Sequence, residues 1–211
     1  MNYGKIDDWC WVHVAKTGGG YVFEQICVMC PILYTYAHGN VTNLKKVKRL
    51  YPEITNFRDL DKDYSLGSVD WDYNNTKFIV TKRNPYERMW SMWHFFYVRP
   101  GKDTTFEQFI KSVPQQIKGR SDLHTDPIVD HVKINGEVRI DHLIDFENME
   151  NDWEEFLSKF DIALPSTAKN NKVRASNYIS SFDISKWSRE SIDIVNESYK
   201  EDFEYFGYEM L

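Results

Sequence analysis

Apolar residues gather along the chain in short runs that are separated by longer stretches of mixed polarity. Three of these runs are dense in strand-forming residues, and we expect β-strands over Trp9–Val14, Ile32–Tyr36 and Lys77–Thr81. A fourth strand is expected over Val138–Phe146. Segments with helical spacing separate the strands, and this alternation indicates a parallel sheet that helices cover on both faces.

The helical segments have their own start signals. Asn84 and Pro85 suit the N-cap and the first position of one helix. Its buried face is expected to carry Met89, Trp90, Trp93 and Phe96. Helices are expected over Tyr21–Met29, Asn43–Leu50, Tyr86–Phe96, Thr105–Val113, the acidic segment that follows Glu147-Asn148 and ends at Phe160, and Ser188–Phe203. Polar loops are expected over Arg58–Asn75, Pro114–Gly136 and Pro165–Ser181.

Length and charge narrow the picture. The chain of 211 residues is 42% hydrophobic, which suits one folded domain over residues 1–211. The predicted fold class is therefore a single α/β domain with a central parallel sheet flanked by helices. A net charge of −6 argues against a nucleic-acid binder, so an anionic ligand would need a local basic site.

The chain shows no obvious targeting or metal-binding pattern. No apolar run approaches the length of a transmembrane helix, and residues 1–8 lack the regions of a signal peptide. We therefore expect a cytoplasmic protein without membrane insertion. Cys27 and Cys30 form a C-x-x-C pair without a second pair of ligands, and we expect reduced, structural thiols there rather than a zinc site.

A glycine-rich turn follows the first predicted strand directly. Its sequence is Ala15-Lys16-Thr17-Gly18-Gly19-Gly20. Consecutive glycines let the backbone turn tightly and aim several N–H groups at one point, with the positive end of a helix dipole behind them. Lys16 adds a charge and Thr17 adds a hydroxyl donor. The pattern predicts a phosphate site rather than a plain strand-to-helix turn.

The order of residues in this turn bears on the kind of phosphate ligand. In nucleotide triphosphatases the Lys and the Ser or Thr follow the glycines, and the hydroxyl binds Mg²⁺. Here Lys16 and Thr17 precede the glycines, and no apolar strand ends in an obvious Asp for Mg²⁺. A ligand bound without a metal is favoured, and a Mg·ATP-dependent phosphotransferase of related fold stays as the alternative.

A second basic segment follows the strand predicted over Lys77–Thr81. Arg83 stands where a parallel strand delivers a side chain to the carboxyl edge of the sheet, and its guanidinium suits a phosphate group. Arg88 and Ser91, three residues apart, share one face of the next helix. Taken singly, Arg83 could equally pair with a carboxylate, and Ser91 could be a small packing residue.

Taken together, four segments resemble the sulfotransferase family, in particular its carbohydrate and heparan-type branch with small bacterial and phage relatives. WVHVAKTGGG is similar to the family's 5′-phosphosulfate loop, and IVTKRNPYERMWSMWHFF is similar to its 3′-phosphate motif. DHLIDFENMENDWEEFLSKF resembles its F-E-N segment, and KEDFEYFGYE resembles its C-terminal D-x-x-x-F-G-Y ending. The resemblance spans residues 9–209. It implies a P-loop-nucleotide-kinase-like sulfotransferase fold and a metal-free transfer from 3′-phosphoadenosine 5′-phosphosulfate (PAPS), which leaves the bisphosphate PAP.

The resemblance also implies roles for single residues. Arg83 and Ser91 would hold the 3′-phosphate, while Arg174 and Ser176 would close over the nucleotide. Relatives place Thr or Ser after the paired glycines, whereas this chain has Gly20-Tyr21, so one hydroxyl donor is missing. The residues implied around the 5′-phosphosulfate are Lys16, Thr17, Gly18, Gly19, Gly20 and Tyr21.

Sulfuryl transfer needs a cation near the leaving oxygen, a role that suits Lys16, and a base for the acceptor's proton. His38 is the predicted base, because it ends a strand at the same sheet edge and imidazole titrates near neutral pH. Glu24 is the rival, and His124 and His131 are candidates for contact with the acceptor. The acceptor is expected to be a small molecule or a glycan with a hydroxyl or an amine. A nucleotide- or glycan-binding module that has lost activity is the non-enzymatic alternative.

Overall fold

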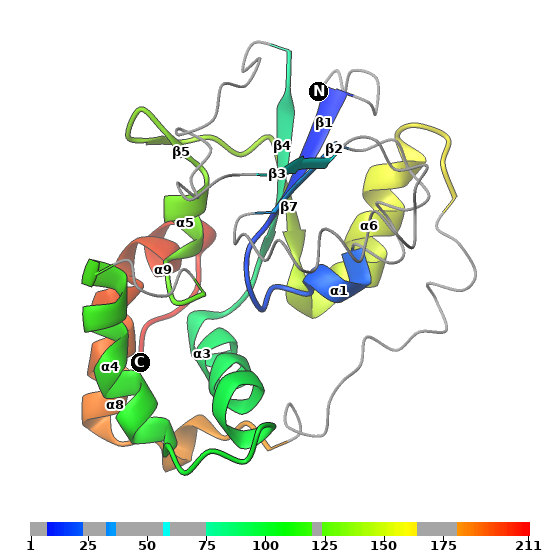
Figure 1. Cartoon of the computed structure of the whole chain (residues 1–211). Helices are drawn as coiled ribbons and strands as arrows, with labels where there is room; N and C mark the ends of the chain where they lie inside the picture. The colour runs from blue at the N-terminus through cyan, green and yellow to red at the C-terminus, as the bar shows by residue number, and fades with distance from the viewer. Residues whose placement is uncertain (1–7, 23–32, 37–56, 60–74, 120–123, 164–180) are drawn as a thin grey trace. The chain divides into compact units, whose positions relative to one another are not determined.

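A computed structural model describes residues 8–22, 33–36, 57–59, 75–119, 124–163 and 181–211 (Figure 1). By its contacts the chain divides into two compact units, and each unit is built from two stretches of chain. Unit 1 comprises residues 1–82 and 131–173, and unit 2 comprises residues 83–130 and 174–211. The prediction of one domain over residues 1–211 stays a prediction.

Unit 1 contains a parallel sheet, which confirms the predicted α/β fold class. All neighbouring strands run parallel, in the order β3-β2-β1-β4-β7. The central strand β1 pairs with a strand on each side, so that Cys10 lies opposite both Leu33 and Phe78. The strands are β1 (Trp9–His13), β2 (Leu33–Tyr36), β3 (Phe57–Asp59), β4 (Lys77–Lys82) and β7 (His142–Asp145).

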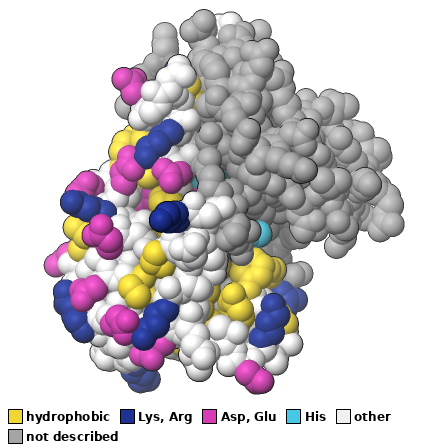
Figure 2. Space-filling view, turned by 60° about the vertical axis from the view of Figure 1, so that its left-hand side comes forward, with side chains coloured by type: hydrophobic (Ala, Val, Ile, Leu, Met, Phe, Trp, Pro, Cys, Tyr) yellow, Lys and Arg dark blue, Asp and Glu magenta, His cyan; other side chains and the backbone are white. Residues whose placement is uncertain are grey.

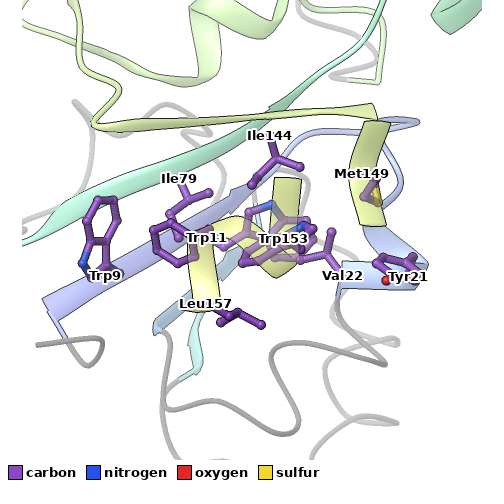
Figure 3. Packing of buried hydrophobic residues seen from close by; sticks show 10 residues of the cluster. Trp9, Trp11, Tyr21, Val22, Ile79, Ile144, Met149, Trp153 and Leu157 are labelled. Carbon is purple, nitrogen blue, oxygen red and sulfur yellow. The ribbon is translucent and has the colours of Figure 1, made fainter. Parts of the chain in front are cut away.

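The core of unit 1 lies between this sheet and α6 (Met149–Ser158). Every residue of β1 is buried, as expected for a central parallel strand. Trp153 and Leu157 of α6 pack in one cluster with Trp9 and Trp11 (Figure 3). The Trp11 indole donates a hydrogen bond of 3.3 Å to the Thr81 hydroxyl of β4, so the large ring is also fixed in direction.

Two parts of unit 1 differ from the sequence-based expectation. The strand β3 begins the stretch that was expected to be a loop over residues 58–75. The strand predicted over Val138–Phe146 is divided: its start lies in a hairpin of β5 (Lys133–Ile134) and β6 (Glu137–Val138), and β7 begins only at His142. Asp141 explains the new start, because its carboxylate accepts a 2.9 Å hydrogen bond from the Phe78 amide and thereby aligns β7 with β4.

The described part of unit 2 consists of helices. The predicted cap is confirmed: the Asn84 side chain accepts a 3.0 Å hydrogen bond from the Tyr86 amide, and Pro85 is the first helical residue. Tyr199 divides the helix predicted over Ser188–Phe203 into two. The elements are α3 (Pro85–Trp93), the π-helical turn η4 (His94–Val98), α4 (Phe106–Gly119), α5 (Ile128–His131), η6 (Ile184–Lys186), α8 (Arg189–Ser198) and α9 (Lys200–Phe206).

The loop predicted over Pro114–Gly136 is wrong in its first part, because α4 continues through Pro114 to Gly119. A proline inside a helix removes one backbone hydrogen bond. The helix persists because Phe109, Ile110 and Val113 bury one of its faces. Burial of this apolar face therefore outweighs the local signal of the proline.

The buried face predicted for α3 is only partly right. Met89 is fully buried, but Trp90, Trp93 and Phe96 are half-buried. Helix α3 also buries polar side chains, including those of Arg88 and Ser91. Figure 2 shows a face of the molecule on which basic and acidic side chains are interspersed. Unit 2 carries exposed ion pairs such as Lys111–Glu190 (2.9 Å).

Candidate functional site

The turn after β1 has an unusual backbone. Lys16 has φ 65° and Gly18 has φ 88°, so two residues of one short turn are left-handed. Thr17 lies between them and is fully buried, and its hydroxyl donates a 2.8 Å hydrogen bond to the Val14 carbonyl. The Thr17 hydroxyl that was predicted to face a phosphate therefore closes the turn in this structure.

Two of the three glycine positions have no room for a side chain. A Cβ atom on Gly18 would lie 2.2 Å from the Met149 methyl carbon, and one on Gly19 would lie 1.8 Å from Nε2 of His13. A Cβ atom on Gly20 would meet nothing within 4 Å. The turn is thus held between the end of β1 on one side and the start of α6 on the other, and only Gly20 could carry a side chain.

These contacts give a physical role to the F-E-N segment. Met149 and Phe146 are the side chains nearest to the missing Cβ of Gly18, at 2.2 and 3.2 Å. Asp152 accepts hydrogen bonds from the Asp145 amide (2.7 Å) and from the Asn148 side chain (2.6 Å), which fixes the chain where Phe146 and Met149 emerge. The F-E-N segment therefore packs against the glycine turn at Gly18 and restricts its position.

The turn carries a set of amide donors. The Gly18 carbonyl accepts from the amides of Tyr21 (2.9 Å) and Val22 (3.2 Å), which begins the helical turn α1 (Gly19–Tyr21). Within the described ranges, no residue accepts a hydrogen bond from the amides of Gly18, Gly19 or Gly20. Together with the half-buried Lys16, these amides form an arrangement that can bind an anion.

The Tyr21 side chain lies in the core of unit 1. Its ring belongs to the core cluster of unit 1, beside Met149 (Figure 3), and its hydroxyl is buried without an acceptor among the described residues. Burial, together with the nearby carboxylates of Glu150 and Glu154, raises the pKa of Tyr21 to about 12. The phenol is therefore neutral at physiological pH, and a direct role of Tyr21 in binding a ligand stays a prediction.

The carboxyl edge of the sheet also carries an ion pair that the sequence analysis missed. Asp145 ends β7, so one strand of the sheet does end in an Asp, and it lies 3.0 Å from the Lys82 ammonium at the end of β4. Whether this Asp suits Mg²⁺ stays a prediction. Burial raises the pKa of Asp145, but its interactions with Glu147 and Lys82 outweigh this effect and hold the pKa below its ordinary value. Asp145 is thus an ionised group whose charge Lys82 balances.

The second predicted phosphate site lies in unit 2. Arg83 directly follows the last residue of β4 and is 2% exposed, and its guanidinium lies 3.6 Å from the Glu87 carboxylate. Ser91 is fully buried on α3. The alternative that Arg83 pairs with a carboxylate is therefore observed in this structure, and binding of a phosphate would require Arg83 to share or exchange that partner.

Several predicted residues cannot be placed. His38 and Glu24, the two candidate bases, lie outside the described residues, and so do Arg174 and Ser176. Cys27, Cys30 and the helix predicted over Asn43–Leu50 also lie outside them.

Three more histidines pack against aromatic rings or are buried, and two of them, His124 and His131, are the candidates for contact with the acceptor. His94 packs between Trp90 and Trp93 at ring distances of 4.9 and 4.8 Å, and burial lowers its pKa. His124 meets the Phe96 ring at 4.8 Å, and His131 is 2% exposed. Contact of His124 or His131 with an acceptor stays a prediction.

Sequence analysis overlooked His13, whose ring stacks on Trp11 at 5.1 Å and lies directly against Gly19. Its position, at the end of a buried strand and three residues before Lys16, is the signal that could have identified it.

None of the helices in the described part of the chain has the length and the apolar character that a membrane span needs. Among the same residues there is no group of three or more His, Cys, Asp or Glu side chains placed to hold a metal ion.

Comparison with known proteins adds one finding. A model of the sulfotransferase family matches residues 7–209, and therefore nearly the whole chain. A comparison with curated proteins gives no match. The matched range includes the glycine turn, the Arg83 segment, the F-E-N segment and the C-terminal segment.

Proposed function

Because this chain belongs to the sulfotransferase family, we propose that it transfers a sulfuryl group from PAPS to a hydroxyl or an amine of a small molecule or a glycan. The observation that carries the proposal is the turn after β1. There Lys16 and three amides without acceptors among the described residues stand together at the carboxyl end of the central strand. A turn of this kind suits the 5′-phosphosulfate group.

The proposed reaction is an in-line displacement. The acceptor oxygen or nitrogen attacks the sulfur atom, and the bond between sulfur and the 5′-phosphate oxygen breaks. The electron pair of that bond stays on the phosphate oxygen of PAP, and the acceptor's proton passes to a base. Lys16 and the turn amides would stabilise the negative charge that grows on the leaving oxygen.

We assign the base to His38, and Glu24 remains the rival. A positioned imidazole accepts a proton near neutral pH without help from a metal. Arg83 and Ser91 would bind the 3′-phosphate, and Arg174 and Ser176 would close over the nucleotide.

A thermal-shift experiment tests the donor. PAP should stabilise the protein, since a ligand that binds only the folded state raises the unfolding free energy by RT ln(1 + [L]/Kd). ATP with Mg²⁺ and NAD serve as comparison ligands, and the PAP shift should survive EDTA. A shift with Mg·ATP alone would favour the phosphotransferase, for which Asp145 supplies a carboxylate at a strand end.

An activity screen tests the transfer itself. Labelled PAPS should pass its sulfuryl group to at least one class among glycans, phenols, steroids, lipids and tyrosine peptides. Binding of PAP without transfer to any class would favour a module that has lost activity.

A further inference from the structure

Unit 2 contains a charged side chain that is fully buried. Arg88 of α3 has no exposed surface, and its Nη2 donates hydrogen bonds to the carbonyls of His124 (3.0 Å) and Asp126 (2.9 Å). A buried guanidinium is costly unless its charge is balanced and its N–H groups find acceptors. The two carbonyls supply acceptors, and the charge is balanced from another helix.

Asp202 of α9 provides the balancing charge. It is 1% exposed, and its two oxygens accept hydrogen bonds from the amides of Ile128 (2.8 Å) and Val129 (2.9 Å) at the start of α5. Burial raises the pKa of Asp202 to about 6, against the opposing effects of Arg88 and the two amides, with Asp130 as a further carboxylate nearby. At neutral pH Asp202 is therefore ionised and faces a cation.

Tyr199 completes the group. Its hydroxyl donates a 2.6 Å hydrogen bond to the Thr125 carbonyl and lies 3.0 Å from the Met89 sulfur, and its ring lies 5.9 Å from the Arg88 guanidinium. Arg88, Tyr199 and Asp202 together, which we name the buried latch, tie α3 to residues 124–129 and to α9. Most of these ties are directional polar bonds, so the latch specifies orientation as well as contact.

The energetics favour a geometric role for the latch. Replacing buried opposite charges by apolar side chains of similar volume is often neutral or stabilising, so the presence of Arg88 and Asp202 is weak evidence for stability alone. What Arg88 and Asp202 supply is a defined geometry, through their hydrogen bonds to the backbone of residues 124–129. In this molecule the geometry belongs to α3, on which Ser91 lies one turn after Arg88 and which Arg83 precedes by two residues.

We propose that Arg88, Tyr199 and Asp202 are positioning residues that orient α3 so that Arg83 and Ser91 can bind the 3′-phosphate of the nucleotide. The proposal rests on the proposed function. It also explains the C-terminal D-x-x-x-F-G-Y segment, because Asp202 belongs to the latch and Gly207 ends α9 with φ 72°.

The test compares two nucleotides that differ only in the 3′-phosphate, namely PAP and adenosine 5′-monophosphate. Tyr199→Phe removes one hydroxyl and keeps the ring, Asp202→Asn removes the charge, and Arg88→Lys keeps the charge and loses the paired geometry. Well below the melting temperature of each variant, PAP affinity should fall about ten- to a hundredfold, because small displacements at a binding group are costly. Affinity for adenosine 5′-monophosphate should stay within about twofold of the wild-type value.

Val113→Ala is the matched control, since Val113 is fully buried in α4 of the same unit and does not belong to the latch. It should lower the melting temperature and leave the ratio of the two affinities unchanged. The proposal is overturned if Tyr199→Phe and Asp202→Asn keep the wild-type ratio, or if Val113→Ala lowers the ratio equally. A wild-type protein with no preference for PAP over adenosine 5′-monophosphate would overturn the proposed function, and this inference with it.

Discussion

The His13 imidazole and the Gly19 backbone lie so close together that each limits what the other position can hold. His13 is 8% exposed and stacked on Trp11, so it has little room to move. Gly19→Ala should therefore lower the unfolding free energy by about 1–3 kcal/mol, the usual cost of overpacking. Denaturant unfolding measures this cost directly.

A matched pair of variants isolates the contact. Gly20→Ala places a methyl group in open space on a helical residue, so it should be neutral or stabilising by up to about 1 kcal/mol. In the double variant His13→Ala/Gly19→Ala, the methyl group added at position 19 enters the volume that the imidazole leaves. The two effects should then be less than additive by about 1 kcal/mol or more. Simple additivity would show that the turn relaxes freely and that His13 does not restrict it.

The two predicted phosphate contacts, Arg83 and Lys16, should affect different kinetic parameters. Arg83→Ala removes a charge-assisted contact and should weaken PAP binding by about 1.5–3 kcal/mol. Lys16→Ala should lower kcat as well, because the Lys16 charge matters most when the leaving oxygen becomes anionic. Residue 16 has a left-handed φ of 65° whether it is Lys or Ala, so the backbone strain at this position is similar in the wild type and in Lys16→Ala. Equal increases in KM alone for the two variants would remove Lys16 from the transition state.

The base is tested by the pH dependence of the rate. If His38 accepts the proton, the wild-type rate should rise with pH through one pKa, and His38→Asn should abolish that rise. The rate of His38→Asn should fall about 10²- to 10⁴-fold, the usual contribution of a general base, with PAP affinity nearly unchanged. Near-full activity in His38→Asn together with loss of activity in Glu24→Gln would assign the role to Glu24.

At the scale of elements, the pairing of α9 with α5 makes stability depend on pH. The pKa of Asp202 is about 6 in the folded state, against its ordinary value of 3.8, so between these pH values folded Asp202 holds a proton that the unfolded chain has released. The Asp202 contribution to the unfolding free energy is therefore favourable at low pH and is lost as pH rises from about 4 to 6. The loss corresponds to about 3 kcal/mol in total.

Asp202→Asn removes this titration. The difference in unfolding free energy between wild type and Asp202→Asn should decrease by about 2.4 kcal/mol between pH 4 and pH 7, while other carboxylates cancel in the difference. Chemical unfolding at a series of pH values measures it. Parallel curves for the two proteins would mean that Asp202 titrates in the folded state as it does in the unfolded chain.

The elements that sequence reasoning predicted well are those with a uniform sequence pattern. The strands β1, β2 and β4 are nearly continuous apolar runs, and their bounds agree with prediction to within a residue. The element β3, with the sequence Phe-Arg-Asp, is too short and too polar to give such a run, and it is a strand because β2 offers it an edge. Pattern alone could not indicate that pairing.

The helices show the same limit. Tyr199 lies inside a stretch of helical spacing, but its backbone leaves the helix at φ −120° and ψ 21°, while its hydroxyl reaches the Thr125 carbonyl. Arg88 was placed on the correct helix, yet its burial depends on carbonyl groups 36 and 38 residues away. At the candidate site, the glycines were identified from the sequence. Their close contacts with His13 and Met149 depend on tertiary packing and were not.

At the scale of the whole molecule, neither unit is a continuous piece of chain. Residues 83–130 hold α3, while Asp202 and Tyr199, which tie α3 to residues 124–129, arrive from residues 174–211. Basic and acidic side chains are interspersed on the face of the molecule that Figure 2 shows. The exposed ion pairs of unit 2 include Arg189–Asp193 (2.9 Å). Such exposed pairs add little stability singly, so the order of unit 2 depends mainly on its buried contacts.

The parallel order of the sheet also has a consequence for how the chain reaches its fold. The strands of the sheet make contacts with residues far along the chain. The Trp11 indole of β1 donates a hydrogen bond to Thr81, 70 residues later, and the Phe78 amide of β4 donates one to Asp141, 63 residues later. Forming such contacts closes large loops, and the entropy cost of closing them comes before the strands pair and stabilise each other. This slows folding. During synthesis β1 would therefore emerge long before its partner β4, although its other partner, β2, follows soon after it. Its apolar side chains would stay exposed in that interval, so refolding yield should depend on protein concentration more strongly than equilibrium stability does.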